Sequence, residues 1–370
     1  MKKVLFVATV DSHILHFHLP YLQMFKEYGY EVHVATNSST PLPYCDVKHK
    51  LPLERSPFSL KNIKAIQVLK KIINKENYNI LHCHTPMGGV VARLAARKSR
   101  KTNGTRVIYT AHGFHFFKGA PIFNWLLYYP IEKILAKITD TIITINQEDY
   151  NIAKKKFKVK QVELVNGVGV NGAKFDFDLA PEEKKNERNK LNLKANDYVL
   201  LYVAELNENK NQITLLEAMK DLAKEDATIK LLLAGEGKLH SYYQQKIIDY
   251  KLQDNVFLLG YRKDIPKLLK ISDLVVATSK REGLPVNLIE AYLSDTPVIA
   301  TNVRGHRDII QKENLVELGD IEELKKKIKN YKNGNSKTDC FCFQKEIYLL
   351  ENIKKQMQRI YFNVSSTKGD

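Results

Sequence analysis

Three hundred and seventy residues are more than one hydrophobic core usually serves, so two domains of ordinary size are expected. A hydrophobic share of 44% and a charged share of 27% are typical of globular proteins and exclude disordered and fibrous chains. Residues 1–170 hold 25 Lys and Arg and 11 Asp and Glu, which is +14 of the net +17. This basic half favours an anionic partner, whether nucleic acid, acidic lipid or a polyanionic substrate.

Short β-branched runs alternate with longer amphipathic stretches, which is typical of βα units in a parallel sheet. In the first half, strands are predicted at 3–10, 31–36, 80–84, 106–111, 141–145 and 162–165. Helices are predicted between them at 19–28, 60–74, 88–100, 122–137 and 147–156. The second half repeats the pattern, with strands at 198–203, 229–234, 256–259, 273–277 and 296–300.

The predicted fold class is α/β, with two Rossmann-like doubly wound domains. We expect an N-terminal domain at 1–170 and a C-terminal domain at 171–343, joined through a glycine-rich linker at 166–179. A last helix within 344–370 carries an apolar stripe, and we expect it to pack back on the first domain. Since α/β ligands bind at the carboxyl ends of strands, the site is expected in a cleft between the domains.

The compartment is predicted from cysteines and apolar runs. Four scattered cysteines fit neither a disulfide framework nor a C-x-x-C motif, so a reducing cytoplasm is the simplest location. No apolar run approaches the ~20 residues of a membrane-spanning helix. The first apolar segment ends at Asp11 without a cleavage pattern, so we interpret it as a buried strand and not as a secretion signal.

One glycine motif matches a dinucleotide-binding pattern but lacks the helix that this pattern requires. Gly167, Gly169 and Gly172 satisfy the G-x-G-x-x-G pattern of dinucleotide-binding proteins. That pattern requires a helix that begins in the loop and binds the pyrophosphate with its amides. Because residues 173–181 have no helical pattern, a nicotinamide cofactor is not expected.

The strongest motif lies at 279–290, after a buried strand. Gly283 permits a tight turn and Pro285 fits the first turn of a helix, whose unpaired amides form an anion site. Glu282 and Glu290 flank these amides and can accept hydrogen bonds from hydroxyl groups. The weight of the motif comes from strand, turn, helix and second glutamate appearing in this order.

This arrangement resembles the E-x7-E motif of family 4 retaining glycosyltransferases, which have the GT-B fold. The resemblance covers nearly the whole chain, because further segments follow the spacing of that family at 204–212, 234–237, 260–266, 271–273 and 297–300, and at Gly305. It implies a GT-B enzyme that transfers a sugar from a nucleotide sugar. A fixed ammonium group and a helix N-terminus would stabilise the departing diphosphate.

The resemblance also implies roles for single residues. Glu290 would bind the ribose hydroxyls, Glu282 the hydroxyls of the transferred sugar, and Lys210 the diphosphate. Further donor-binding residues would be the amides of Gly283, Leu284 and Val286, the loop at Gly235, and Tyr261 and Arg262 beside the base.

Many members of the family carry an arginine at the position of Glu205, so diphosphate binding here would depend on Lys210 and backbone dipoles, with Arg281 or Lys280 as further cations. An exposed lysine without a role is the alternative for Lys210.

In the first domain, His112 follows a strand, and the resemblance implies that it touches the donor sugar near the anomeric centre. A structural loop histidine is the alternative.

Asp11 and His16 lie in the segment 11–20, expected as a loop, where an H-F-x-x-P element suggests an acceptor-side role. The histidines of that loop lack a carboxylate at ligand spacing, so we expect neither zinc nor any other metal or cofactor.

The segment 114–135 combines many aromatic residues with Lys118 and Lys133. This composition suits a membrane surface, and core packing explains it equally well. The charge of the first half favours contact with anionic lipid.

The sequence therefore predicts a cytoplasmic, peripherally membrane-associated, retaining glycosyltransferase. We expect it to move a hexose or N-acetylhexosamine from a nucleotide sugar, most simply a UDP-sugar, to a lipid-linked saccharide in surface polysaccharide assembly. A nucleotide-sugar epimerase or hydrolase of the same fold is the first alternative, and a basic nucleic-acid-binding protein is the second. Nucleic acid is not expected as a partner, because no recognition module accompanies the charge.

Overall fold

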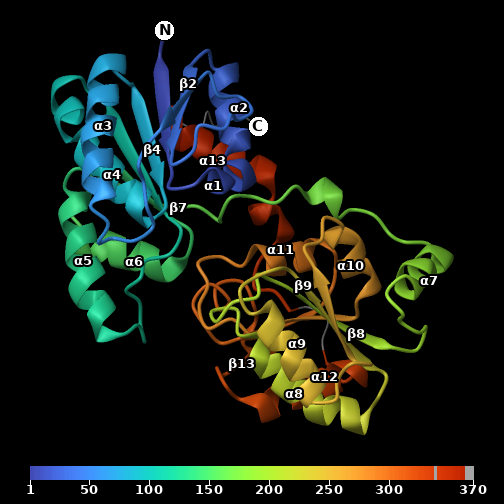
Figure 1. The fold of residues 1–370 in the computed structure, drawn as a ribbon. Helices are drawn as coiled ribbons and strands as arrows, with labels where there is room; N and C mark the ends of the chain where they lie inside the picture. Colours follow the sequence, from blue (N-terminus) through green and yellow to red (C-terminus); the bar gives the residue numbers. More distant parts are fainter. Residues whose placement is uncertain (337–339, 363–370) are drawn as a thin grey trace. The chain divides into compact units, whose positions relative to one another are not determined.

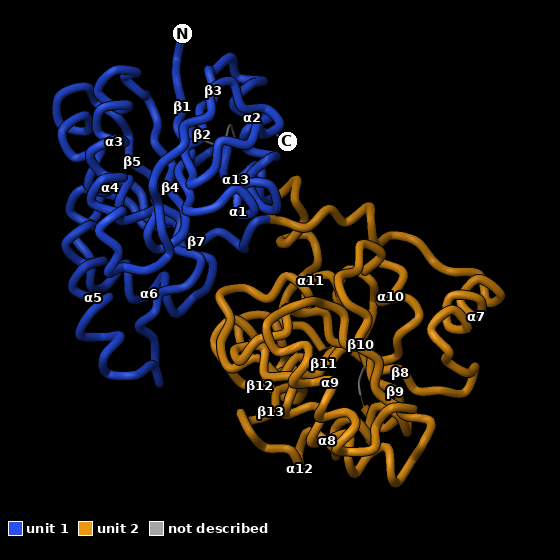
Figure 2. The backbone as a smooth tube through the Cα atoms, viewed as in Figure 1, with its two compact units in different colours: residues 1–168, 353–370 blue, residues 169–352 orange. Residues whose placement is uncertain are grey.

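The computed structural model describes residues 1–336 and 340–362, which form two compact units (Figures 1 and 2). Unit 1 comprises residues 1–168 and the segment from residue 353 onward, and unit 2 comprises residues 169–352. The first boundary falls two residues before the expected position. Part of the expected last helix, residues 344–352, belongs to unit 2, and its expected end at 363–370 lies outside the described residues.

Unit 1 is built on a parallel seven-stranded sheet in the order β3-β2-β1-β4-β5-β6-β7. Its strands are β1 (Lys3–Val7), β2 (Glu31–Thr36), β3 (Val47–Lys50), β4 (Ile80–His84), β5 (Arg106–Ala111), β6 (Thr141–Thr144) and β7 (Gln161–Leu164). Its helices before the linker are α1 (Asp11–Phe17), α2 (Leu19–Glu27), α3 (Lys61–Glu76), α4 (Pro86–Thr102), α5 (Ile122–Ala136) and α6 (Gln147–Lys156). The segment expected as a loop at 11–20 is therefore helical over most of its length, because Ile14 is buried and anchors the short helix α1.

Apolar residues alternate between the two faces of this sheet, so each face has its own core. Leu5 and Leu81 pack with helices α3 and α4 on one face. Val4 and Ile80 pack with helices α1 and α2 on the other face. This alternation follows from the strand period of two residues and buries the sheet on both sides, as parallel sheets require.

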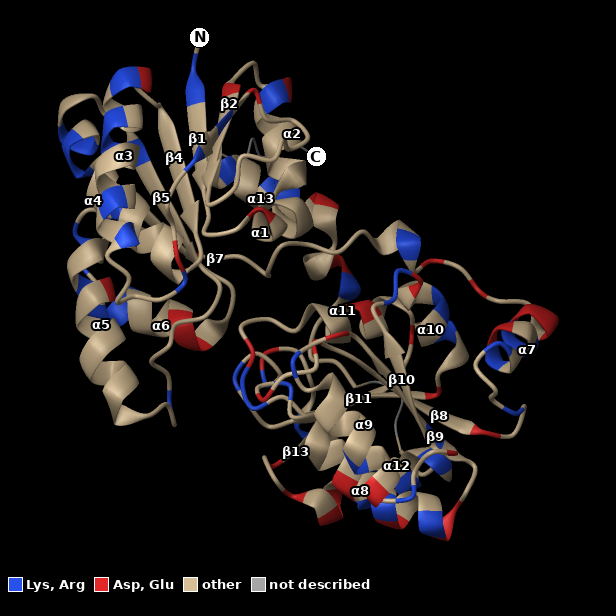
Figure 3. Ribbon diagram, in the orientation of Figure 1, with Lys and Arg blue, Asp and Glu red and all other residues tan. Residues whose placement is uncertain are grey.

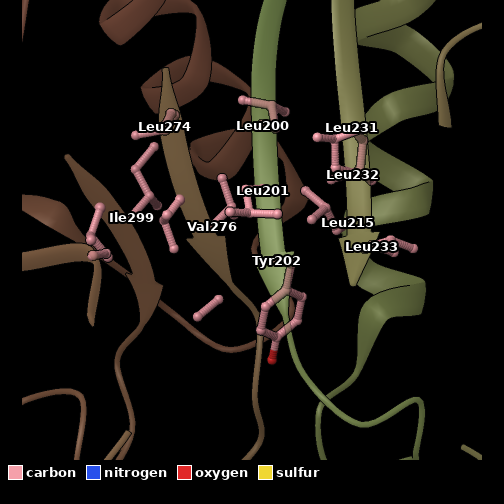
Figure 4. Packing of buried hydrophobic residues seen from close by; sticks show 14 of the residues in the cluster. Leu200, Leu201, Tyr202, Leu215, Leu231, Leu232, Leu233, Leu274, Val276 and Ile299 are labelled. Carbon is pink, nitrogen blue, oxygen red and sulfur yellow. The ribbon is translucent and has the colours of Figure 1, made fainter. Parts of the chain in front are cut away.

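Unit 2 has a parallel six-stranded sheet in the order β10-β9-β8-β11-β12-β13. Its strands are β8 (Tyr198–Val203), β9 (Ile229–Ala234), β10 (Val256–Gly260), β11 (Leu274–Ala277), β12 (Val298–Thr301) and β13 (Leu315–Val316). Its helices are η1 (Gly172–Lys174), α7 (Pro181–Asn189), α8 (Gln212–Glu225), α9 (His240–Asp249), α10 (Ile265–Ile271), α11 (Val286–Leu293), η2 (Lys312–Asn314), α12 (Ile321–Lys332) and η3 (Lys345–Tyr348). Leucines of β8 and β9 interdigitate with β11 and β12 in one core (Figure 4).

The last helix, α13 (Leu350–Phe362), returns the chain to unit 1. Its side chains Ile353, Met357, Ile360 and Tyr361 are buried in the core that also contains α1 and α2. The Tyr361 hydroxyl lies 2.8 Å from Nδ1 of His82 on β4. Unit 1 is therefore completed by a segment that follows unit 2 in the sequence.

Both sheets reverse their strand order once, between β1 and β4 in unit 1 and between β8 and β11 in unit 2. At such a switch point the loops after the two strands run to opposite faces of the sheet and leave room for a ligand at the carboxyl edge. The topology thus selects the loops after β1 and β4 and those after β8 and β11 as candidate sites.

Candidate active site

In unit 2, the loops after β8 and β11 are joined by an ion pair between Lys210 and Glu282. Nζ of Lys210 lies 2.6 Å from Oε1 of Glu282, and both side chains are mostly buried. The resemblance implied donor contacts for both residues, and they meet at the switch point of the sheet. Since an ammonium group has three donors, Lys210 can bind Glu282 and a phosphate oxygen together.

Hydrogen bonds fix the two loops to each other. The Asn211 side chain donates to the carbonyl of Thr278 at 3.2 Å, and the Thr278 hydroxyl donates to the carbonyl of Asn211 at 2.9 Å. Tyr202, at the end of β8, donates its hydroxyl to the carbonyl of Lys210 at 2.9 Å and lies 2.8 Å from the Ser279 hydroxyl. Figure 4 shows this hydroxyl directed away from the leucines of the core. The hydrogen bond from Tyr202 therefore holds the backbone of Lys210 in a fixed position relative to the core.

Burial and charge act in opposite directions on Glu282. Burial raises the pKa of this carboxyl, but the charge and hydrogen bond of Lys210, together with His306 and a hydrogen bond from Ser279, outweigh burial and hold the pKa below its usual value. Glu282 is therefore ionised at neutral pH and can accept hydrogen bonds from hydroxyl groups on a ligand.

Helix α11 begins directly after this loop, as the motif predicted. Within the described residues, the amides of Gly283, Leu284 and Val286 have no hydrogen-bond partner. They lie at the positive end of α11 and can donate to an anion. Glu290 lies further along the same helix, where burial raises its pKa to about 7 against a smaller opposite effect of Lys174.

Two glycines allow the loops of this edge to pack closely. Gly235 has φ 151°, and a Cβ atom there would lie 2.0 Å from the carbonyl oxygen of Ala204. Gly305 has φ 84°, and a Cβ atom there would lie 2.9 Å from Cβ of Glu282. Gly305 therefore supports the loop of Glu282 directly, whereas Gly235 joins the loops after β9 and β8.

The remaining residues predicted for the donor lie near the end of β10 or on exposed loops. Tyr261 is 63% exposed, so its ring is free to stack on a ligand. Arg262 is held by Asp264, with Nε 2.8 Å from Oδ1. Lys280 and Arg281, the further cations considered for the diphosphate, are exposed, and so is Glu205, where many family members have an arginine. The donor-binding roles of Tyr261, Arg262, Lys280 and Arg281 stay predictions.

In unit 1, the predicted acceptor-side residues lie at opposite ends of α1. The Asp11 carboxylate accepts hydrogen bonds from Lys48 and Thr36, so it holds α1 to β2 and β3. His16 is exposed, and its Nδ1 lies 2.6 Å from the carbonyl of Ser12. His16 lines a cavity of about 500 Å³ with apolar walls, to which His13, Phe17, Arg55, Pro57, Met87, His115 and Tyr128 also contribute.

His112 follows β5, as predicted, and faces a neighbouring histidine. Its Nε2 lies 3.2 Å from Nε2 of His13 on α1. Beside them, the rings of His18 and His84 stack with centroids 3.7 Å apart. The Nε2 atom of His112 therefore contacts His13 inside unit 1. A sugar would have to contact the opposite side of the His112 ring.

For the aromatic segment at 114–135 the sequence left core packing and contact with a membrane surface open, and the structure shows both buried and exposed residues there. Phe114 and Phe116 are buried in the core. Along α5, in contrast, Ile122, Phe123, Leu126 and Ile134 are 75%, 59%, 71% and 62% exposed. No helix in the described part of the chain is long and apolar enough to span a membrane.

Comparisons with known proteins now identify the family. Residues 183–341 match the family model of the glycosyl transferases group 1, and residues 3–146 match that of the glycosyl transferase 4-like domain. A protein of Bacillus subtilis (strain 168) named as glycosyltransferase EpsD is 46% identical over 331 residues, covering 88% of this chain and 86% of the relative. The chain is a group 1 glycosyltransferase.

Two more distant relatives have named activities or pathways. A UDP-Gal:alpha-D-GlcNAc-diphosphoundecaprenol alpha-1,3-galactosyltransferase of Escherichia coli is 32% identical, covering 72% of this glycosyltransferase and 69% of its own length. The capsular polysaccharide biosynthesis glycosyltransferase CapM of Staphylococcus aureus is 24% identical over 85% of this chain and 84% of its own.

The solved structure of Anabaena HepE with UDP and glucose aligns with this glycosyltransferase with a TM-score of 0.75 at 18% identity, covering 98% of this chain and 100% of that one. The predicted family and the GT-B fold are thus confirmed. Sequence reasoning missed the meeting of His18 with His84, because it depends on β1 and β4 being neighbours in the sheet, which periodicity does not reveal.

Proposed function

We propose that this glycosyltransferase moves a hexose or N-acetylhexosamine from a UDP-sugar to a lipid-linked saccharide, with retention of configuration, in surface polysaccharide assembly. The observation that carries the proposal is the buried Lys210–Glu282 pair at the switch point of unit 2, beside the unpaired amides at the start of α11. The names of the E. coli and S. aureus relatives support the lipid diphosphate acceptor and the polysaccharide product.

In the proposed reaction, the bond between the anomeric carbon and the β-phosphate oxygen breaks, and a bond from an acceptor hydroxyl forms on the same face. The acceptor proton passes to the departing diphosphate. Negative charge develops on that diphosphate, and Lys210 and the amides of α11 are preorganised to stabilise it. The donor side therefore requires no divalent metal. Glu282, ionised, would orient the sugar through its hydroxyl groups.

The cavity of unit 1 is proposed to receive the saccharide end of the acceptor. Helix α5 contributes Tyr128 to the wall of this cavity, while its exposed apolar side chains face away from the core. Lys118, Lys133 and Lys137 are exposed on or beside α5. Further Lys and Arg residues lie along α3 and α4 (Figure 3). A peripheral position on the inner face of an anionic membrane would bring a lipid-linked acceptor to the cavity.

The test is transfer from radiolabelled UDP-sugars to a synthetic GlcNAc-diphosphate-lipid. Lys210→Ala is expected to lower turnover by about 10²–10³, the loss seen when one preorganised donor to a developing anion is removed. Lys220→Ala is the matched control, because Lys220 also forms an ion pair with a glutamate of unit 2, Glu217, on the exposed face of α8.

Equal turnover in Lys210→Ala and the control would refute the donor site. Release of free sugar at the same rate with and without the lipid would identify a hydrolase. Inversion at the anomeric carbon, determined by NMR of the product, would refute retention alone.

A further inference from the structure

Four histidines of unit 1 meet at the carboxyl edge of its sheet. This histidine cluster consists of His13 on α1, His18 between α1 and α2, His84 at the end of β4 and His112 after β5. One ring nitrogen of each histidine lies within 4.8 Å of a ring nitrogen of every other. Because β1, β4 and β5 are neighbours in the sheet, three distant segments of the chain deliver these rings to one place.

His18 and His84 of the cluster differ from the nearby His82 in their hydrogen bonding. His82 lies two residues before His84 on the same strand, and both of its ring nitrogens have partners, the hydroxyls of Tyr361 and Thr110, each at 2.8 Å. His18 and His84 are 2% and 0% exposed, yet in the described part of the chain neither ring nitrogen of either has a hydrogen-bond partner. Leaving a buried polar group without a partner costs free energy, so four such nitrogens on two stacked rings indicate a ligand.

The chemistry of the cluster selects the kind of ligand. All four members are histidines, and among the described residues the group includes no carboxylate or thiol. Imidazole nitrogen is a ligand that suits zinc and related transition metals, so such an ion fits the cluster.

Against the expectation from the sequence, we propose that the histidine cluster binds a divalent transition-metal ion of the zinc type. Tetrahedral zinc with Zn–N bonds of ~2.0–2.1 Å places its ligand atoms about 3.4 Å apart. The Nε2 atoms of His13 and His112 are already 3.2 Å apart. The stacked rings of His18 and His84 would part by side-chain rotation as all four nitrogens close on the ion.

Four protein ligands leave no open coordination position, so the ion has a structural role. It ties α1 to the ends of β4 and β5 and thereby fixes one wall of the cavity that His13 and His16 line. His13 and His112 keep partial exposure, so the positive charge of the ion is not fully desolvated. This inference does not depend on which sugar the enzyme transfers.

The test uses the full chain without an affinity tag, stripped with a chelator and titrated with Co²⁺ followed by Zn²⁺. One equivalent of Co²⁺ is expected to bind with the strong visible absorption of tetrahedral cobalt, and Zn²⁺ is expected to displace it. His13→Gln and His84→Asn should each weaken binding by more than the ~10–100-fold that loss of an outer-shell group costs. His16→Gln is the matched control, because His16 lies on α1 outside the cluster.

Circular dichroism establishes whether each variant folds. His13 is partly exposed, so His13→Gln decides the question if His84→Asn does not fold. Absence of stoichiometric binding to the wild-type chain would overturn the proposal, and so would wild-type affinity in folded His13→Gln. An effect of His16→Gln equal to that of His13→Gln would place the metal outside the cluster and would also overturn it.

Discussion

Glu282 and Glu290 carry the same carboxyl group in two different environments. Lys210 lies against Glu282 and helps to keep it ionised, whereas Glu290 forms no ion pair with the described residues and burial raises its pKa to about 7. The two glutamates of the motif therefore differ near neutral pH. Glu282 is a constant acceptor of hydrogen bonds, and Glu290 gains and loses its charge in the physiological range.

The raised pKa of Glu290 makes a prediction for stability. The folded chain binds this proton more tightly than the unfolded chain, whose ordinary value is 4.5, so the stabilisation from protonation is lost as the pH rises from about 4.5 through about 7. Glu290→Gln keeps the shape of the protonated acid without its charge. At pH 8 the variant should be more stable than the wild type by about 1–3 kcal/mol, and at pH 4.5 the two should be equal.

Denaturant unfolding at each pH measures this difference. The control is Glu236→Gln, because it makes the same substitution at an exposed glutamate of unit 2. A Glu290→Gln variant that tracks the wild type from pH 4.5 to 8 would show that the carboxyl titrates at its ordinary value.

At the scale of elements, α5 has two opposed surfaces. Glu132 is buried and accepts two hydrogen bonds from Arg93 of α4, at 2.8 and 3.0 Å, which anchors the helix to unit 1. The face with Phe123 and Leu126 remains exposed. An anchored helix with an exposed apolar face and neighbouring lysines is suited to lie at a lipid headgroup boundary.

Leu126→Glu should therefore weaken binding to vesicles that contain an anionic lipid. The added charge opposes both burial in the headgroup region and attraction to the acidic surface, so we expect at least a tenfold loss, or about 1.4 kcal/mol. Sedimentation with phosphatidylglycerol vesicles measures it. Ile248→Glu on α9 is the control, because Ile248 is a similarly exposed aliphatic residue of unit 2. Equal losses in both variants would exclude a specific role of α5.

The elements also show what the sequence could predict. Strands β2, β4 and β5 have the predicted bounds, because buried parallel strands are continuous apolar runs between polar turns. Helix α1 was expected as a loop, since two turns hold too few residues for a helical period to show. The resemblance singled out Lys210 and Glu282 separately, but their ion pair was not predicted, because it joins loops 72 residues apart in the sequence. The histidine cluster was not predicted either, because it depends on strand order, which only the folded sheet defines.

At the scale of the whole molecule, α13 makes unit 1 discontinuous in sequence. Met357 is 4% exposed within the core of unit 1, so Met357→Ala should cost about 2–5 kcal/mol in that unit. Because unit 2 has its own core, hydrogen exchange should accelerate in β1 and β4 and stay unchanged in β8 and β9. Lys355→Ala, on the exposed side of α13, is the control. Equal acceleration in both sheets after Met357→Ala would mean that the two units unfold as one cooperative body, and the separate cores would then not define separate folding units.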